Sequence, residues 1–287
     1  MRNVLSVIDH LTLGADGIYS GMVVGNKLQI LEIELRESVA KKEYDNYLET
    51  IALSHSIPVM DTEIENFLEL IPKNGVILDV GGCWGWHWRF IDELRPDVTV
   101  VIMDFIRENL THAKKLLDGE LAYQVILVHA DAMKLPFDDD SFDGIWSVQT
   151  YQHIPNLEAA FSEASRVLKI NLPFYIYGLH RTPMIELLFF LCNKKYHISG
   201  VVENSYILNR MSDEQKTIGE TIFNSSAKES YSECLFHPEL RTRFTGKDKS
   251  VWGYLDKFLA GFFIAKYIAR QRAFKFINSK SYTPLDD

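Results

Sequence analysis

The sequence has few cysteines. Cys83, Cys192 and Cys234 are far apart and stand in no metal-ligand spacing. An odd number of widely separated cysteines does not predict a disulfide framework and is typical of a reducing compartment. We therefore expect neither a disulfide-stabilised scaffold nor a bound metal.

Clusters of positive charge are absent as well. No group of lysines or arginines is larger than a pair, and the formal net charge of the 287 residues is −9. Binding to nucleic acid requires a concentration of positive charge that neutralises backbone phosphates. This charge balance argues against a nucleic-acid partner.

Long apolar runs are missing too. The two most apolar segments, residues 187–192 and 258–268, are short or interrupted by Lys266, whereas a spanning helix needs about 20 apolar residues. Near the N-terminus, Asp9 and His10 come too early for a signal peptide. We expect a cytoplasmic protein with no membrane insertion.

A glycine turn between a strand and a helix is the central feature of the sequence. Residues 76–80 form a short apolar run, typical of a buried parallel strand, and Gly81, Gly82 and Gly85 follow. Residues 86–94 have the pattern of an amphipathic helix. Glycines let the backbone approach a ligand closely, and a helix N-terminus offers N–H groups to an anion, so this corner is a candidate nucleotide site.

Strands and helices alternate after this corner. We expect strands at residues 97–104, 123–129, 144–148 and 174–177, with helices at 106–117 and 156–168. This alternation of strands and helices predicts an α/β fold with a parallel sheet covered on both faces by helices. Asp104, at the tip of the second strand, is placed to accept the ribose hydroxyls of an adenosine. Alternatively, it caps the helix that follows.

The N-terminal segments have a different character. Residues 4–8, 18–24 and 28–35 are β-rich and separated by turn-forming residues, which predicts a small β extension over residues 1–40. A helical pattern follows, and Asp61 is the expected N-cap of a helix over residues 61–70. The turn at 72–75 ends that helix before the central strand.

Several motifs together resemble those of the class I S-adenosylmethionine-dependent methyltransferases. They are Leu-Asp-Val-Gly-Gly-Cys-Trp-Gly at 78–85, the acid Asp104, Asp131-Ala with Leu-Pro-Phe-Asp-Asp-Asp-Ser-Phe-Asp at 135–143, and Glu-Ala-Ser-Arg-Val-Leu-Lys at 163–169. The match runs from about residue 75 to 176 and is similar to the small-molecule branch that includes ubiquinone/menaquinone-biosynthesis enzymes. The resemblance implies a Rossmann-like, mostly parallel seven-stranded sheet.

The resemblance also implies a cofactor, S-adenosylmethionine, with S-adenosylhomocysteine as product. The glycine turn would surround its methionine part, Asp104 would bind the ribose, and Asp131 would accept from the adenine amino group. The full set of cofactor residues it implies is Asp79, Gly81, Gly82, Trp84, Gly85, Asp104, Phe105, Asp131, Ala132, Ser147 and Gln149. Alternatively, Asp79 orders the glycine turn without touching the ligand. We expect Trp86 and Trp88 to serve as packing residues.

Two histidines are candidate catalytic bases for an oxygen acceptor. His153 follows the fourth strand and His180 the fifth, at the sheet edge where ligands bind. Each could instead be a hydrogen-bonded loop histidine. His87, in the helix after the glycine turn, is a weaker candidate and fits a packing role better.

Two departures from the family pattern leave a catalytically silent, partner-binding relative as an alternative. Cys83 replaces the middle glycine of the usual loop, which requires that its φ stay negative. The helix that normally ends in Pro-Gly-Gly ends in Lys-Ile-Asn-Leu-Pro at 169–173. A nucleotide-dependent oxidoreductase fits less well, because the chain has no Gly-x-Gly-x-x-Gly spacing and carries Asp131 with the Leu-Pro-Phe segment.

We divide the rest of the chain by the same resemblance. The methyltransferase domain covers residues 41–287, with N-terminal helices at 41–72, the cofactor core at 73–180 and a lid at 181–245, joined by Tyr44 and Tyr47. A final helix at 250–261 and a strand pair at 262–269 and 273–277 close the sheet. The lid could instead form a homodimer surface. Its apolar character favours methylation of O, N or C of a small, partly hydrophobic metabolite.

Overall fold

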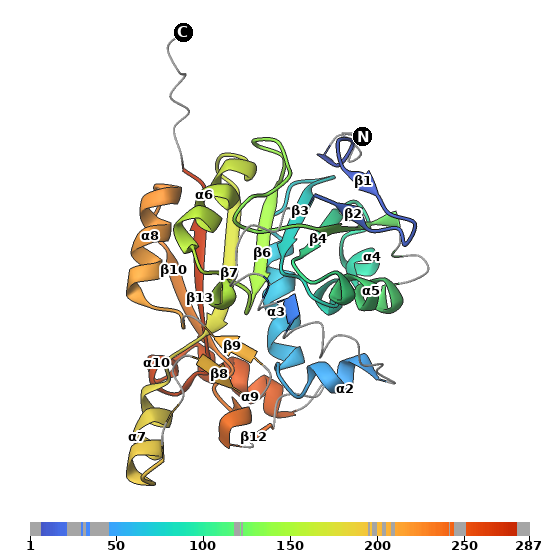
Figure 1. Cartoon of the computed structure of the whole chain (residues 1–287). Helices are drawn as coiled ribbons and strands as arrows, with labels where there is room; N and C mark the ends of the chain where they lie inside the picture. Colours follow the sequence, from blue (N-terminus) through green and yellow to red (C-terminus); the bar gives the residue numbers. More distant parts are fainter. Residues whose placement is uncertain are drawn as a thin grey trace.

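The computed structural model describes residues 7–21, 30, 33–34, 46–117, 121, 123–194, 196, 200–202, 205–207, 210–240, 242–243 and 251–279. Within them, a sheet of nine strands runs through the molecule in the order β1-β2-β5-β4-β3-β6-β7-β13-β10 (Figure 1). Its strands are β1 (Thr12–Leu13), β2 (Tyr19–Ser20), β3 (Val76–Val80), β4 (Thr99–Asp104), β5 (Val125–His129), β6 (Gly144–Val148), β7 (Pro173–Leu179), β10 (Lys228–Ser232) and β13 (Gln271–Ile277).

Seven of these strands form the expected mostly parallel sheet. β5, β4, β3, β6 and β7 are parallel, whereas β13 runs antiparallel to both β7 and β10. The short β1–β2 hairpin adds to the edge of β5. The α/β, Rossmann-like architecture predicted from the sequence is therefore confirmed.

Alternating side chains divide the core into two layers. Leu78 and Val80 of β3 face one apolar cluster, which includes α6 (Leu157–Val167) and α8 (Asp213–Phe223). Ile77 faces the other, which includes α3 (Ile57–Leu68) and α5 (Arg107–Leu116). Helices on both faces explain why β3, in the middle of the parallel strands, is buried along its whole length.

The expected helix over residues 86–94 is wrong in detail. The structure has a 3₁₀-helix, η2 (Trp86–Trp88), followed by a four-residue helix, α4 (Ile91–Leu94). Trp86, His87 and Trp88 are all buried. Three consecutive residues of a 3₁₀-helix point in three directions about 120° apart, so this turn is covered on several sides and has no single amphipathic stripe.

The N-terminal helix starts earlier than predicted. α3 begins at Ile57, with Ser56 as N-cap and a proline in the first turn, because proline suits the first helical position. Asp61 lies inside this helix and forms an ion pair with Arg89 at 2.6 Å. The short helix α2 (Tyr47–Ile51) precedes it and is capped by the side chain of Asn46.

Of the two predicted closing strands, the one at 273–277 is present as part of β13 and the one at 262–269 is wrong. Residues 262–269 are not a strand, because they contain α10 (Ala265–Ile268), which follows α9 (Val251–Ala260). The partner of β13 is β10, inside the segment interpreted as a lid. β10 reads Lys-Glu-Ser-Tyr-Ser, and an edge strand needs no continuous apolar run, so its sequence gave little signal. α8, from the same segment, packs against α6 in the core.

Of the predicted N-terminal β runs, only part lies within the described residues. β2 falls within 18–24, whereas residues 7–8 form a turn and residues 33–34 are helical. Residues 4–6, 22–24, 28–29, 31–32 and 35 of these runs lie outside the described residues, as does Tyr44. No helix of the described chain is long and apolar enough to cross a membrane.

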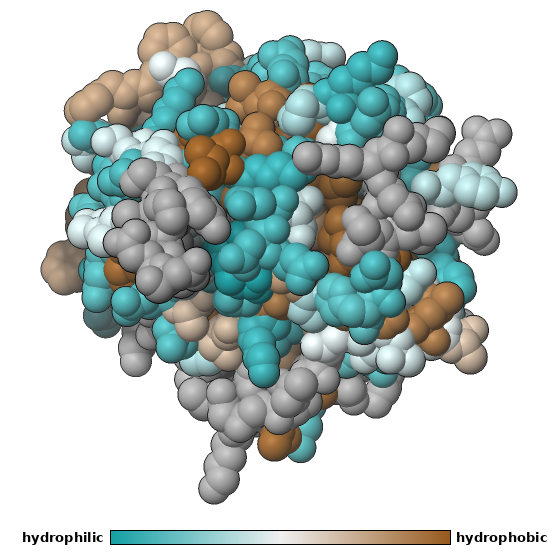
Figure 2. Space-filling view, turned by 90° about the horizontal axis from the view of Figure 1, so that it is seen from above, coloured by the Kyte–Doolittle hydropathy of each residue, from teal (hydrophilic) through white to brown (hydrophobic). Residues whose placement is uncertain are grey.

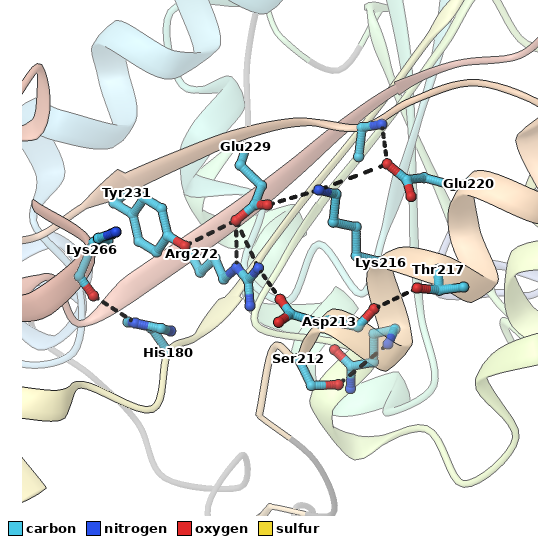
Figure 3. Close-up of polar contacts among 12 residues, drawn as sticks. His180, Ser212, Asp213, Lys216, Thr217, Glu220, Glu229, Tyr231, Lys266 and Arg272 are labelled. Atoms are coloured by element: carbon cyan, nitrogen blue, oxygen red, sulfur yellow. Dashed lines mark hydrogen bonds and ion pairs between the residues drawn. The ribbon is translucent and has the colours of Figure 1, made fainter. Parts of the chain in front are cut away.

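A polar network joins α8, β10 and β13 at the sheet edge (Figure 3). Glu229 accepts hydrogen bonds from Lys216 at 2.9 Å, Arg272 at 2.7 Å and Tyr231 at 2.9 Å. Arg272 also bonds to Asp213 at 2.6 Å. Burial alone would raise the pKa of Glu229, but these donors outweigh it and hold the pKa at about 2.

We expect this network to make the fold sensitive to acid. The pKa of Glu229 is lower in the folded chain than its unfolded value of about 4.3, so its stabilising contribution is complete above that value and is lost as pH falls towards 2. In Glu229→Gln, urea unfolding should show a smaller loss of unfolding free energy between these pH values. Glu65→Gln, at an exposed position, is the control. An unchanged pH profile in Glu229→Gln would contradict the assignment.

Candidate cofactor-binding site

The glycine turn connects the carboxyl ends of β3 and β4. The backbone N–H groups of Gly81 and Gly82 both donate to the carbonyl of Met103, at 2.7 and 3.1 Å. Gly81 has φ +70°, and a Cβ there would lie 2.1 Å from the Thr150 hydroxyl. A Cβ on Gly82 would lie 2.3 Å from Asp79 Oδ2. Both positions therefore require glycine for this close approach.

Asp79, near the end of β3, is a buried carboxylate with a hydrogen-bond partner on only one of its two oxygens. Its Oδ2 accepts a 2.7 Å hydrogen bond from Trp88 Nε1, and its Oδ1 is buried without a hydrogen-bond partner. Burial raises the pKa of Asp79 to about 7, and the nearby charge of Asp104 acts in the same direction. A buried, unpartnered carboxylate oxygen is costly unless a ligand cation completes it.

Asp104, the last residue of β4, holds the far side of the turn. Its Oδ2 accepts from the backbone N–H of Cys83 at 2.9 Å. Its Oδ1 accepts from the N–H of Ile106 at 2.8 Å and from Asn109 Nδ2 at 3.2 Å. Ile106 is the N-cap residue of α5, so Asp104 supports the start of that helix.

Two non-glycine residues beside the turn have strained backbones. Cys83 has φ +51°, which corrects the expectation of a negative φ, and it is exposed. Gln149, directly after β6, has φ +54°; its N–H donates to the carbonyl of Tyr177 at 2.7 Å, and its Nε2 is buried without a partner. Such strain concentrates at functional sites. Cys83 therefore keeps the loop shape that glycine usually gives.

We expect Cys83→Gly to stabilise the protein. Relief of the left-handed strain should raise the free energy of unfolding by about 1 kcal/mol, reduced by the greater freedom of glycine in the unfolded chain. Denaturant unfolding measures this. Asn74→Gly is the matched control, because Asn74 has φ +57° but asparagine tolerates that region. A destabilised Cys83→Gly would show that the thiol makes a favourable contact.

The motifs at 135–143 and 163–169 are bound to each other. Arg166, near the end of α6, donates to the carbonyls of Phe137 at 2.7 Å and Leu135 at 3.0 Å. Glu163, which pairs with Arg166, accepts from the N–H of Leu135 at 2.7 Å. This clamp fixes the segment after β5 that carries Asp131. The two motifs therefore have a structural role that explains their joint appearance.

Asp131 and Ala132 lie in the turn after β5. Asp131 Oδ1 accepts from the N–H of Met133 at 2.9 Å, and the side chain is half-buried. Ala132 is buried at the edge of the core. The carboxylate of Asp131 thus orders its own turn, which follows β5, two strands away from β3 in the sheet.

Two other residues assigned to the cofactor by the resemblance, Ser147 and Trp84, make contacts with other parts of the protein. Ser147 is fully buried, and its hydroxyl donates to the carbonyl of Val80 at 2.8 Å, which joins β6 to β3. Trp84 is buried beside Tyr47 of α2 and His112 of α5, with ring centroids 5.4 Å away in each case. In the structure Ser147 thus connects two strands and Trp84 packs between two helices, and the cofactor contacts that the resemblance implies for them stay predictions.

Gly85 and Phe105 complete the set. Gly85 has φ +67°, and a Cβ there would lie 2.6 Å from Leu117 and 2.7 Å from Ile102. Its role is the close packing of the turn against α5 and β4. Phe105 is half-buried, and its carbonyl lies 3.2 Å from His129 Nε2, next to Asp104.

The two candidate bases lie beyond the ends of β6 and β7. His153, in the 3₁₀-helix η4 (Tyr151–His153), has its Nε2 3.2 Å from Gln152 Nε2. His180 Nε2 lies 3.0 Å from the carbonyl of Lys266 (Figure 3), and its Nδ1 is buried without a partner. Burial lowers the pKa of His180, although the Lys266 carbonyl opposes this. A neutral imidazole with a free nitrogen can accept a proton.

His87 is held among aromatic rings. Its ring centroid lies 3.9 Å from that of Trp86 and 5.7 Å from that of Trp146, and its Nδ1 has no partner. Burial holds the pKa of His87 well below its usual value. This environment agrees with the packing role that the sequence favoured.

Trp88 and Thr150 are site residues that the sequence analysis did not assign to the site. Trp88 fixes the carboxylate of Asp79, and Thr150 Oγ1 lies 3.2 Å from the carbonyl of Gly81. Trp88 could have been found from its place in an aromatic cluster next to the glycine turn. Thr150 carries no comparable signal, because its contact depends on how the loop after β6 folds back.

Comparison with known proteins agrees with this geometry. Residues 78–175 match the family described as "Methyltransferase domain". The demethylmenaquinone methyltransferase of Roseiflexus castenholzii is 32% identical over 100 residues, which is 35% of this chain and 41% of that protein. The ubiquinone/menaquinone biosynthesis C-methyltransferase UbiE of Paracoccus denitrificans is 35% identical over 103 residues, with the same two shares. The chain thus matches less than half the length of these relatives.

Solved structures share the fold at low sequence identity. The cyclase SpnF superposes with a TM-score of 0.57 at 12% identity, covering 91% of this chain and 100% of that chain. Phosphoethanolamine N-methyltransferase 2 of Haemonchus contortus, in complex with S-adenosyl-L-methionine, gives a TM-score of 0.51 at 16% identity, covering 76% of this chain and 53% of that chain. Residues 78–175 are therefore a methyltransferase domain of the class I, S-adenosylmethionine-dependent type.

Proposed function

We propose that this chain binds S-adenosylmethionine at the glycine turn and transfers its methyl group to a small, partly apolar metabolite. The observation that carries the proposal is the unpartnered Oδ1 of buried Asp79, directly beside Gly81 and Gly82, where the backbone has no room for a Cβ. An amino-acid ammonium is a cation that would satisfy this oxygen. Asp104 ends the neighbouring strand, β4, and its carboxylate is bound to the turn through the N–H of Cys83. The donor set therefore fits this cofactor.

Each residue has a separate task in the proposal. Asp79 binds the ammonium, Gly81 and Gly82 allow the cofactor to lie against the backbone, and Asp104 accepts from the ribose. Asp131 is the proposed acceptor for the adenine amino group, with Phe105 and Ala132 beside the ring. When bound, the cofactor supplies a methyl group activated on a cationic sulfonium. The protein contributes alignment and exclusion of water.

An oxygen acceptor would also need a base. His180 is the better placed of the two candidates, because its Nδ1 is free to accept a proton, whereas its Nε2 faces the Lys266 carbonyl. His153 would act after a small change in its contact with Gln152. Gln149, with its buried amide nitrogen and strained backbone, is proposed to orient the acceptor.

The lid of the proposed domain is smaller than the sequence suggested. Residues 213–232 belong to the sheet and its covering helix, which leaves α7 (Pro183–Leu191) and the hairpin of β8 (Gly200–Val202) and β9 (Ser205–Ile207). β9 lies next to η4, which carries His153. We propose that this hairpin and α7 cover the acceptor side of the site.

A methyl-transfer assay tests the proposal. The protein is incubated with S-adenosylmethionine and a panel of small phenols, hydroquinones and amines, and S-adenosylhomocysteine is quantified by mass spectrometry. We expect acceptor-dependent release that falls by about 10²-fold or more in His180→Ala if the acceptor is a phenol. Cofactor binding without turnover on any acceptor, together with copurification of another chain, would favour the silent, partner-binding alternative instead.

A further inference from the structure

The helix after β7 is apolar on nearly all sides and is exposed. In α7, Phe190 is 78% exposed, Leu191 69% and Leu187 55%, and Ile185 alone is buried. A helix of a water-soluble domain normally shows one apolar stripe and a polar opposite face. α7 therefore has apolar surface that its own fold does not cover.

A second exposed apolar segment lies beside it. α10 packs against α7, and Thr182, at the start of α7, donates to the carbonyl of Ala269 at 2.7 Å. Figure 1 shows α7, α9 and α10 together at the lower end of the molecule, beyond the end of β7. The exposed apolar residues of this second segment are Val251, Trp252, Tyr254, Leu255, Phe258, Phe262, Phe263, Ile264 and Tyr267.

We call residues 183–194 and 251–268 the apolar face. Contiguous exposed apolar patches larger than a few hundred Å² are rare on monomeric proteins and mark interaction sites. The opposite end of the molecule, seen from above in Figure 2, is mostly hydrophilic, with apolar residues in small separate groups. The exposed apolar residues of α7, α9 and α10 thus gather at one end.

The exposed charges of the apolar face that lack an ion pair with a described residue are positive. Lys194, Lys257 and Lys266 form no ion pair with any residue that the structure describes, although the whole chain has a net charge of −9. The ammonium of Lys266 lies 3.9 Å from the ring centroid of Phe263. The acids do not offset these lysines, because Glu186 pairs with Arg181 and Asp256 is buried.

We propose that the apolar face docks on an anionic lipid bilayer. Aromatic and aliphatic side chains with lysines among them match the boundary between acyl chains and anionic headgroups. Protein interfaces, by contrast, are depleted in lysine. α7 is about 13 Å long, so it would lie in one leaflet rather than span the membrane. Docking does not depend on the proposed methyl transfer, although it would bring the end of β7 close to lipid-soluble acceptors.

Vesicle flotation of the full chain tests this surface without cofactor or acceptor. We expect the protein to float with vesicles of three parts phosphatidylcholine to one part phosphatidylglycerol, and to bind pure phosphatidylcholine more weakly. Phe262→Ser with Phe263→Ser should weaken partitioning by about tenfold or more. Lys257→Glu with Lys266→Glu should remove the preference for the anionic lipid.

Controls separate docking from unfolding and from self-association. Tyr123→Ser changes an aromatic residue that is 91% exposed outside the apolar face and should leave flotation unchanged. Circular dichroism of each variant verifies the fold. Absence of flotation in the wild type, or flotation equal in wild type and the double phenylalanine variant, would overturn the proposal. A soluble dimer that Phe262→Ser with Phe263→Ser dissociates, without vesicle binding, would assign the face to a second copy.

Discussion

Asp79→Asn is expected to weaken S-adenosylmethionine binding by about tenfold to a hundredfold near pH 7.5. The substitution keeps the shape of the side chain and an acceptor for Trp88, which donates to Asp79 at 2.7 Å. It removes the charge from the buried oxygen that has no partner in the protein. A charge-assisted hydrogen bond contributes about 1.5–3 kcal/mol, which corresponds to that loss. Isothermal titration calorimetry measures it.

The pH dependence of S-adenosylmethionine binding tests whether the carboxyl of Asp79 binds the ligand's ammonium. Because burial raises the pKa of Asp79 to about 7, most of this carboxyl is protonated at pH 5.5 and about half is ionised at pH 7. Affinity for a ligand with an ammonium should therefore rise by roughly tenfold over that range and should stay flat in Asp79→Asn. Methylthioadenosine, which lacks the amino-acid part, is the control ligand and should show no rise. The same rise in Asp79→Asn would assign the titration to another residue.

Arg270→Met is expected to destabilise the protein by about 3–5 kcal/mol. Arg270 pairs with Glu233, which is fully buried, at 2.9 Å, and donates to the carbonyl of Ser54 at 2.8 Å. Glu233 also accepts from the N–H of Ser56 at 2.9 Å. Loss of the arginine would leave a buried carboxylate without its counter-charge and would release the loop before α3. Urea unfolding at pH 7 measures the change.

Two further variants test whether the buried charge of Glu233 causes the destabilisation of Arg270→Met. Glu233→Gln with Arg270→Met should be more stable than Arg270→Met alone, because the stranded charge is removed. Arg181→Met, which breaks an exposed pair with Glu186, should cost less than about 1 kcal/mol. Equal losses in Arg181→Met and Arg270→Met would show that burial of the Glu233 pair has no special effect.

The sequence was most informative where local pattern and position coincide. Asp79 lies next to the end of one apolar run and Asp104 ends another. Parallel strands bring their carboxyl ends to one sheet edge, so the proximity of the two acids could be predicted. The glycines before and after Cys83 predicted close approach of a ligand to the backbone, and in the structure Thr150 and Asp79 leave no space for a Cβ at Gly81 and Gly82.

Other features depend on contacts between distant segments. The buried Glu233 meets Arg270 from 37 positions away, and no local pattern marks a glutamate with φ +59°. β10 is a polar edge strand, so periodicity could not separate it from a loop. The bond from Trp88 to Asp79 requires the 3₁₀ geometry of η2, whereas the sequence predicted a regular helix. Arg166 was recognised as part of a motif, but its clamp on residues 135–137 appears only in three dimensions.

Calorimetric titration of the purified chain with S-adenosylmethionine tests the central claim most directly. S-adenosylhomocysteine and NADH serve as comparison ligands, and Asp104→Ala as the variant. Binding of both adenosyl ligands in the micromolar range, weak or absent binding of NADH, and loss of binding in Asp104→Ala are the predicted results. Absence of binding by both adenosyl ligands, or binding that Asp104→Ala leaves unchanged, would contradict the assignment of the cofactor to the glycine turn.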